Sequence, residues 1–164
     1  MQSCFDLNAA CTGFLFAYNT AQTYIAAGLA KCALVIGTES LSKLVDWTDR
    51  STCILFGDGA GAAILQAEEG DFPSMVFHSN GGTGGRALSC GSRADYIHMD
   101  GQAVFKFAVR QVPLCISELL EKEGLAPEDI DYFILHQANQ RIVEAVARRL
   151  GLTVEKFPMN LQEY

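Results

Sequence analysis

A cysteine and a histidine occupy similar positions in two distant parts of this 164-residue chain. Cys11 lies in DLNAACTGFLFAY, where an extended apolar run meets a helical pattern, and His136 lies in DYFILHQANQR, between an apolar run and another helical pattern. A thiol is a useful nucleophile as a thiolate, and the positive end of a helix dipole favours that form. Because a cysteine with a distant histidine is a known catalytic arrangement, the pair indicates nucleophilic catalysis.

Each of the two residues also has a simpler structural interpretation. Free cysteines are often buried as small hydrophobic side chains, and a histidine at a strand end can serve only local hydrogen bonds. The similar strand-to-helix positions of Cys11 and His136 favour the catalytic hypothesis for both. Gln137 and Asn139 add two amides that could orient a ring or a substrate carbonyl, at the carboxyl end of a strand where open α/β sheets bind ligands.

The elements that must position these residues alternate along the chain. Extended or apolar runs predict strands, and apolar residues three and four apart predict helices. The predicted strands are 4–8, 31–40, 75–80 and 131–137, and the predicted helices are about 11–28, 101–123 (despite Pro113) and 138–151. A glycine-rich break interrupts the apolar run 53–67, and 81–96 is expected to be a long loop. This alternation predicts the α/β class, with helices packed on a largely parallel sheet.

Two glycine-rich segments need to be distinguished from nucleotide-binding motifs. GDGAGAA at 57–63 is similar to a dinucleotide fingerprint, but no amphipathic helix follows it. GGTGGR at 81–86 lacks the Gly-Lys-Ser/Thr of a phosphate-binding loop. We therefore interpret both segments as tight turns that need positive φ.

Composition and charge exclude several classes of protein. The net charge of -7 argues against a general nucleic-acid binder. The sequence contains no run of about 20 apolar residues, so no membrane span is predicted. The first residues contain no secretory signal, so we expect reduced thiols and a cytoplasmic protein. The six cysteines form no C-x-x-C pair and no cluster with zinc spacing. Four of them are interpreted as small buried hydrophobes because their segments are apolar, namely Cys4, Cys32, Cys53 and Cys115.

The basic residues are few but grouped. Arg141 and Arg148 are seven apart in the predicted helix after His136, with Arg149 adjoining them, and Lys106 and Arg110 are four apart in an earlier helix. On an acidic protein such a local patch suits an acidic partner, although a solvated helix face is an equally good interpretation of the spacing.

Four segments together resemble one known family. DLNAACTGFLFAY, DWTDRSTCILFGDGAGAAIL, MDGQAVFKFAV and LHQANQRIVEAVARRLG occur in the order in which similar segments occur in β-ketoacyl-acyl carrier protein synthase III. This family consists of thiolase-fold condensing enzymes that start bacterial fatty acid synthesis. The resemblance extends from one end of the chain to the other.

The resemblance implies a role for both reactive residues. The family's acylated cysteine, in AACTGF, corresponds to Cys11, and its histidine, in HQAN, corresponds to His136. The implied reaction is a decarboxylative condensation of an acyl-coenzyme A primer with malonyl-acyl carrier protein. In it, His136 and an asparagine stabilise the charge that develops on the malonyl thioester oxygen. In the family, that asparagine follows a glycine and precedes Thr or Ser. This sequence reaches Tyr164 before such a motif, and Asn139 belongs to HQAN and does not replace the family's asparagine.

Binding residues are implied in the same way. Arg50 of DWTDR resembles the residue that stacks on the coenzyme A adenine, and Phe105, Asn139 and Ile142 resemble the tunnel for the pantetheine arm. The residues that resemble the docking patch for the acidic carrier protein are Lys106, Arg141, Arg148 and Arg149. The resemblance implies acyl-coenzyme A as a substrate, no permanently bound cofactor and no metal.

The implied fold is thiolase-like, with helices on mixed, largely parallel sheets in two duplicated halves. Residues 1–70 would be the remainder of the N-terminal half, and 71–164 a truncated C-terminal half. We expect a fragment that lacks both ends and does not complete the condensation alone, because the family's chains are roughly twice as long. The thiolase fold places the nucleophile helix at a dimer interface, so the intact enzyme is expected to be a homodimer.

Other functions stay open at this stage. A polyketide starter synthase or a thiolase would share the fold, although a thiolase needs a second catalytic cysteine near its C-terminus. An elongating synthase would pair its cysteine with two histidines, which fits HQAN less well. The alternative without enzymatic activity is a fragment that serves dimerisation or binds the carrier protein.

Overall fold

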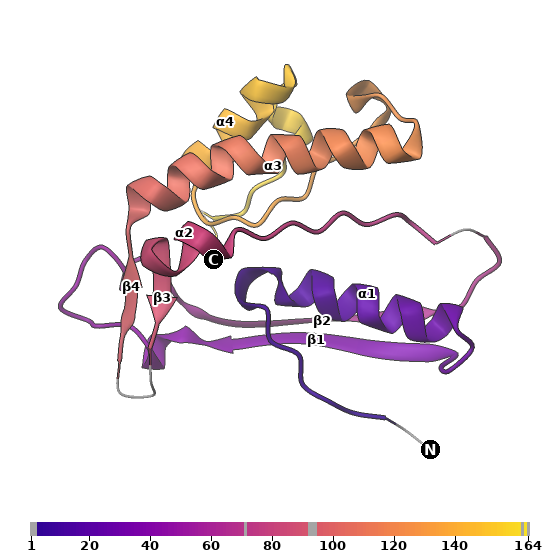
Figure 1. Ribbon diagram of the computed structural model, residues 1–164, viewed down its shortest axis with the longest axis horizontal. Coiled ribbons are helices and arrows are strands. Elements are labelled where there is room, and N and C mark those ends of the chain that lie inside the picture. Colours follow the sequence, from indigo (N-terminus) through magenta and orange to yellow (C-terminus); the bar gives the residue numbers. More distant parts are fainter. Residues whose placement is uncertain (1–2, 71, 92–94, 162, 164) are drawn as a thin grey trace. The chain divides into compact units, whose positions relative to one another are not determined.

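The computed structural model describes residues 3–70, 72–91, 95–161 and 163, and it contains both helices and strands (Figure 1). The chain divides into two compact units. Unit 1 consists of Met1–Ser42 and Gly57–Pro73, and unit 2 consists of Lys43–Phe56 and Ser74–Tyr164. The predicted boundary at residue 70 concerns duplicated halves of a fold and stays a prediction.

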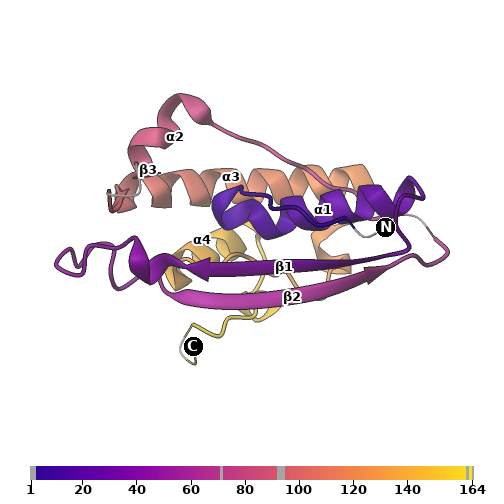
Figure 2. The ribbon, with the colours of Figure 1, turned by 90° about the horizontal axis from the view of Figure 1, so that it is seen from below.

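Unit 1 is one helix packed on a two-stranded ladder. Its elements are η1 (Ala10–Thr12), α1 (Gly13–Ala26), β1 (Cys32–Ser40) and β2 (Asp58–Gln66). Helix α1 lies along the ladder in both ribbon views and contacts β1 and β2 (Figure 1, Figure 2). Gly37 of β1 faces the Phe14 ring of α1, since a Cβ at this position would stand 3.4 Å from that ring, at ordinary van der Waals contact. Val35 of β1 and Ile25 of α1 are buried in this contact layer.

The ladder of unit 1 differs from the predicted strand arrangement in two respects. Strands β1 and β2 pair antiparallel, with Leu34 opposite Ile64, whereas the apolar run of β1 had indicated a parallel neighbour. The turn predicted at 57–63 is wrong, because most of this segment is strand β2 and neither Gly59 nor Gly61 has a positive φ. Small residues fit a strand as well as a turn, so their composition alone does not distinguish the two.

Unit 2 is built around the long helix α3. Its elements are α2 (Gly81–Ala87), the hairpin strands β3 (Leu88–Cys90) and β4 (Ile97–Met99), α3 (Gly101–Glu123), η3 (Pro127–Asp129), α4 (Gln140–Leu150) and η4 (Val154–Lys156). Helix α3 begins where the Asp100 side chain accepts hydrogen bonds from two backbone amides, and it ends at Gly124 with φ 66°. As predicted, it continues through Pro113.

The core of unit 2 lies between α3, α4 and the segments that flank α4. Its buried members are Leu120, Phe133, Val143, Val146, Ala147 and Phe157. Phe133 and Phe157 stack with ring centroids 5.0 Å apart, and the Phe133 amide donates to the Lys156 carbonyl at 2.8 Å. The segment that leads to His136 is therefore held by the segment that follows α4.

Three predicted strands are not strands in the described part of the chain. Residues 4–8, 75–80 and 131–137 have no strand assignment, and no described strand pairs with them in a ladder. Residues 75–80 lie against α3 instead: the Ser74 amide donates to Glu123 at 3.0 Å, and His78 contacts Glu118 at 2.6 Å.

The prediction of a loop at 81–96 is also wrong, because α2 and β3 lie within this range. The prediction of a tight turn at 81–86 is wrong as well, because these residues lie in α2. Residues 92–94 lie outside the described part. The mixture of helices and strands nevertheless confirms the predicted α/β class, although both described ladders are antiparallel. Within the described ranges, no helix combines the length and the apolar character that crossing a membrane requires.

Candidate active site

Cys11 lies in the short turn that leads into α1. The turn is held locally, because the Asn8 side chain accepts from the Ala10 amide at 3.0 Å and the Thr12 hydroxyl donates to the Ala9 carbonyl at 2.9 Å. Ala10 has φ 48°, an uncommon value for a residue with a side chain. The turn leaves Cys11 exposed, so it is not a buried core cysteine in unit 1.

The other cysteines differ in their surroundings. Burial raises the pKa of the Cys115 thiol, and the nearby Glu118 carboxylate raises it further, which disfavours a nucleophilic thiolate there. Cys53 is half-buried. The predicted burial of Cys4 and Cys32 is wrong, since both are exposed. Cys4 lies in a segment that no strand of the described ranges pairs with, and Cys32 begins β1 at the end of its ladder.

His136 lies in unit 2, three residues after Phe133, which bonds to Lys156 and stacks on Phe157. His136 is exposed to solvent, but the surrounding protein partly desolvates its ring, and this desolvation lowers the pKa of His136. A lowered pKa favours the neutral imidazole at neutral pH. A neutral ring can still donate one hydrogen bond to an oxygen that becomes negatively charged.

The two amides that follow His136 are engaged by the backbone. The Gln137 oxygen accepts from the Asn160 amide at 2.8 Å, and the Asn139 oxygen accepts from the Arg141 amide at 2.9 Å, which caps α4. The sequence had indicated amides that orient a ring or a substrate. In the structure their oxygens hold the turn itself, and the contact with Asn160 could not be predicted because it joins residues 23 positions apart.

Arg50 is exposed in a turn of unit 2 that is shaped by two aspartates. Asp46 accepts from the amide and hydroxyl of Thr48, and Asp49 accepts from those of Ser51. These hydrogen bonds lower the pKa of both carboxyls, and the bonds from the hydroxyl groups have the largest effect. The turn is therefore held by its own side chains on both sides of Arg50.

The remaining predicted binding residues all belong to unit 2. Phe105 and Lys106 are exposed near the start of α3, Ile142 is half-buried in α4, and Arg141 is exposed on α4. Arg148 and Arg149 are exposed in the last turn of α4, and Arg149 Nη1 donates to the Val109 carbonyl of α3 at 2.7 Å.

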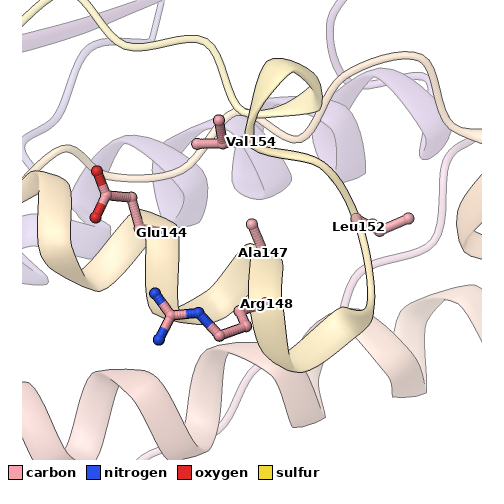
Figure 3. A pocket seen from close by; sticks show the side chains of 5 residues that line it. All are labelled: Glu144, Ala147, Arg148, Leu152 and Val154. Carbon is pink, nitrogen blue, oxygen red and sulfur yellow. The ribbon is translucent and has the colours of Figure 1, made fainter.

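A surface hollow of about 330 Å³ opens beside the last turns of α4. Arg148 lines it together with Glu144, Ala147, Leu152 and Val154 (Figure 3). Glu144 is not among the predicted site residues, although its i, i+4 spacing to Arg148 is visible in the sequence. The basic side of α4 therefore includes one acidic group.

Cys11 is the only predicted site residue in unit 1, and all the others lie in unit 2. Among the described residues, no three His, Cys, Asp or Glu side chains gather in a way that could hold a metal ion.

Solved structures of condensing enzymes share this fold. The structure of 3-oxoacyl-[acyl-carrier-protein] synthase III from Aquifex aeolicus matches 98% of the chain with a TM-score of 0.90 and 44% identity, over 52% of its own length. A priming β-ketosynthase from the R1128 polyketide pathway matches 91% of the chain with a TM-score of 0.83 and 37% identity, over 48% of its length. The chain therefore has the fold of the thiolase-like condensing enzymes.

The sequence comparisons identify the family more narrowly. Residues 5–81 match the family model 3-oxoacyl-[acyl-carrier-protein] synthase III, and residues 120–164 match the model of its C-terminal part. A β-ketoacyl-[acyl-carrier-protein] synthase III from Clostridium acetobutylicum is 47% identical in an alignment that covers 99% of this chain and 54% of the relative. The chain belongs to the β-ketoacyl-[acyl-carrier-protein] synthase III family, as its four segments had indicated. It spans about half the length of the curated relatives it matches.

Proposed function

We propose that the protein carrying this chain condenses an acyl-coenzyme A primer with malonyl-acyl carrier protein and thereby starts fatty acid synthesis. The observation that carries the proposal is the exposed Cys11 at the start of α1, within the segment that the family model matches. The name shared by the curated relatives supports the same reaction class.

The first half-reaction transfers the acyl group to Cys11. The thiolate attacks the carbonyl carbon of the acyl thioester, a new C–S bond forms at Cys11 Sγ, and the bond to coenzyme A breaks. Coenzyme A leaves as a thiolate and takes up a proton. The exposed side chain of Cys11 and the small residues on either side of it support access of the ester to the thiol.

The second half-reaction forms the carbon–carbon bond. Malonyl thioester loses CO₂, and the bonding electrons become an enolate whose negative charge lies on the thioester oxygen. The enolate carbon attacks the acyl carbonyl, and Cys11 leaves as a thiolate. We assign to His136 a hydrogen bond to the thioester oxygen, because partial desolvation lowers its pKa and favours the neutral ring. One such donor typically contributes about 10²–10³ in rate.

Substrate binding is assigned to unit 2. Arg50 would contact the adenine of coenzyme A, and Phe105, Asn139 and Ile142 would line the path of its pantetheine arm. Lys106, Arg141 and Arg148 are the proposed docking cations for the acidic carrier protein, and Arg149, the fourth cation of the predicted patch, donates to the Val109 carbonyl. The bond between Arg149 and Val109 supports one continuous surface, since it joins the last turn of α4 to the turn of α3 that follows Lys106.

The proposal includes three further features of the whole protein: a homodimer, a cytoplasmic location and no permanently bound cofactor. A second candidate function is priming of polyketide synthesis, which is favoured by the 37% identity to a priming β-ketosynthase. The two functions share the acylation of Cys11 and differ in the acyl primer and the carrier protein.

The test is the intact mass of the whole protein after incubation with acetyl-coenzyme A, followed by malonyl-carrier protein. We expect one added acetyl group, located on Cys11 by peptide mapping, and its loss when the malonyl substrate is added. Cys11→Ala should remain unacylated. Acylation at another residue, or none with any short primer, would contradict the proposal. A panel of primers and of the two carrier proteins separates the two functions.

A further inference from the structure

Helix α3 contains a proline in its interior, at position 113 of a helix that spans Gly101–Glu123. In a regular α-helix the amide of residue 113 donates to the carbonyl of residue 109, four positions earlier. Proline has no N–H, and its ring also crowds that carbonyl. The Val109 carbonyl is therefore the one acceptor in α3 that Pro113 deprives of its helical donor.

Arg149 supplies a donor to this same carbonyl. Its Nη1 atom lies 2.7 Å from the Val109 oxygen, although the two residues are 40 positions apart and lie on different helices. The distance is at the short end for an N–H donor, as expected for a charged group. Because Val109 is half-buried, a lost partner would not be fully replaced by water.

We propose that Arg149 is a positioning residue, which replaces the helical hydrogen bond that Pro113 removes and so fixes the end of α4 against α3. Lys106 lies three residues before Val109, and Arg148 directly precedes Arg149. The bond therefore sets the spacing between a cation of α3 and a cation of α4.

One consequence rests on the proposed function. If Lys106 and Arg148 dock an acidic carrier protein, Arg149 contributes the geometry of that surface and not a docking charge. Arg148 is its matched control, since it is the neighbouring residue, carries the same charge and is also exposed, but lines the hollow with Glu144 (Figure 3).

The first experiment measures urea unfolding of the whole protein by circular dichroism. R149M is compared with R148M, each with Pro113 and with the P113A substitution. With Pro113 present, R149M should raise the unfolding equilibrium constant roughly tenfold, the effect of losing a hydrogen bond to a charged group. With P113A the alanine amide can donate to Val109, so R149M should have little further effect. R148M should have little effect in either background. Equal losses for R149M in both backgrounds would overturn the proposal.

The second experiment measures condensation kinetics at a temperature where all variants are folded. R149M should raise the KM for malonyl-carrier protein several-fold, leave kcat and acylation by free acyl-coenzyme A unchanged, and keep the salt dependence of KM. R148M should reduce that salt dependence, because it removes a docking charge. An unchanged KM in R149M would overturn the positioning role. So would a loss of salt dependence as large as in R148M, which would show direct contact with the carrier protein.

R149K serves as a second variant if R149M does not fold. It keeps the charge and an N–H donor group but not the planar guanidinium, so it should lose some stability with Pro113 present and little with P113A, and equal losses in both backgrounds would contradict the role of the bond. If the unaltered protein shows no condensation at all, the proposed function fails, while the unfolding comparison still decides the role of Arg149.

Discussion

The stacked pair of Phe133 and Phe157 holds the segment that ends at His136, so its removal should affect both stability and catalysis. Phe133 is 8% exposed and Phe157 is 1% exposed, with ring centroids 5.0 Å apart. Replacing a buried phenylalanine with alanine costs about 3–5 kcal/mol, and loss of an aromatic pair adds to that cost. At about 2–4 °C per kcal/mol for a domain of this size, Phe133→Ala should lower the Tm by roughly 6–20 °C.

The neighbouring Tyr132 provides a matched control. It is also aromatic and lies in the same segment, but it is 65% exposed. Tyr132→Ala should therefore change the stability by no more than about 0.5 kcal/mol. Thermal melts of the two variants in the whole protein, followed by circular dichroism, measure the difference.

The same pair of variants tests the link to catalysis. Well below its Tm, Phe133→Ala should slow condensation, because His136 lies only three residues further along the held segment. Acylation of Cys11, which belongs to the other unit, should be less affected. Equal Tm changes for the two variants would refute the packing argument. A slowed acylation equal to the slowed condensation would refute the link to His136.

Three further predictions follow from individual residues. Iodoacetamide should label Cys11 in the folded protein well before Cys115, because the Cys115 thiol is half-buried and has a raised pKa. Peptide mapping measures the order of labelling, and labelling of Cys115 first would contradict this prediction. Since partial desolvation lowers the pKa of His136 below its ordinary value of 6.5, the unfolded chain binds the proton first, so stability should fall as the pH drops through and below 6.5. Urea titrations at several pH values should show this dependence weakened in H136Q, and an unchanged dependence would contradict it. Gly151→Ala should reduce the free energy of unfolding by about 1 kcal/mol, because the φ of 71° is unfavourable for alanine. Gly101→Ala in helix α3 should be neutral or stabilising, and equal changes in Tm for the two variants would disprove the argument.

The expectation that residues 1–164 alone do not complete the condensation also stays a prediction. A condensation assay on this chain by itself would test it.

Local sequence patterns were sufficient for much of the fold and for the family. The apolar spacing predicted α1 and α4 to within a few residues, and Gly151 marked the end of α4 because its left-handed conformation suits glycine. The strand at 32–40 was visible as a continuous apolar run. The motif around Cys11 and the HQAN motif at His136 indicated the family, which the comparisons confirmed.

Features that depend on distant partners were decided only by the tertiary structure. Residues 131–137 have the composition of a strand, but they are held by Lys156 and Phe157 and have no strand partner among the described residues. The sequence likewise grouped Arg149 with its basic neighbours, and only the packing of α4 on α3 brings it to the Val109 carbonyl. Periodicity reports which face of an element is apolar, whereas a hydrogen-bond partner 40 residues away depends on how two elements pack.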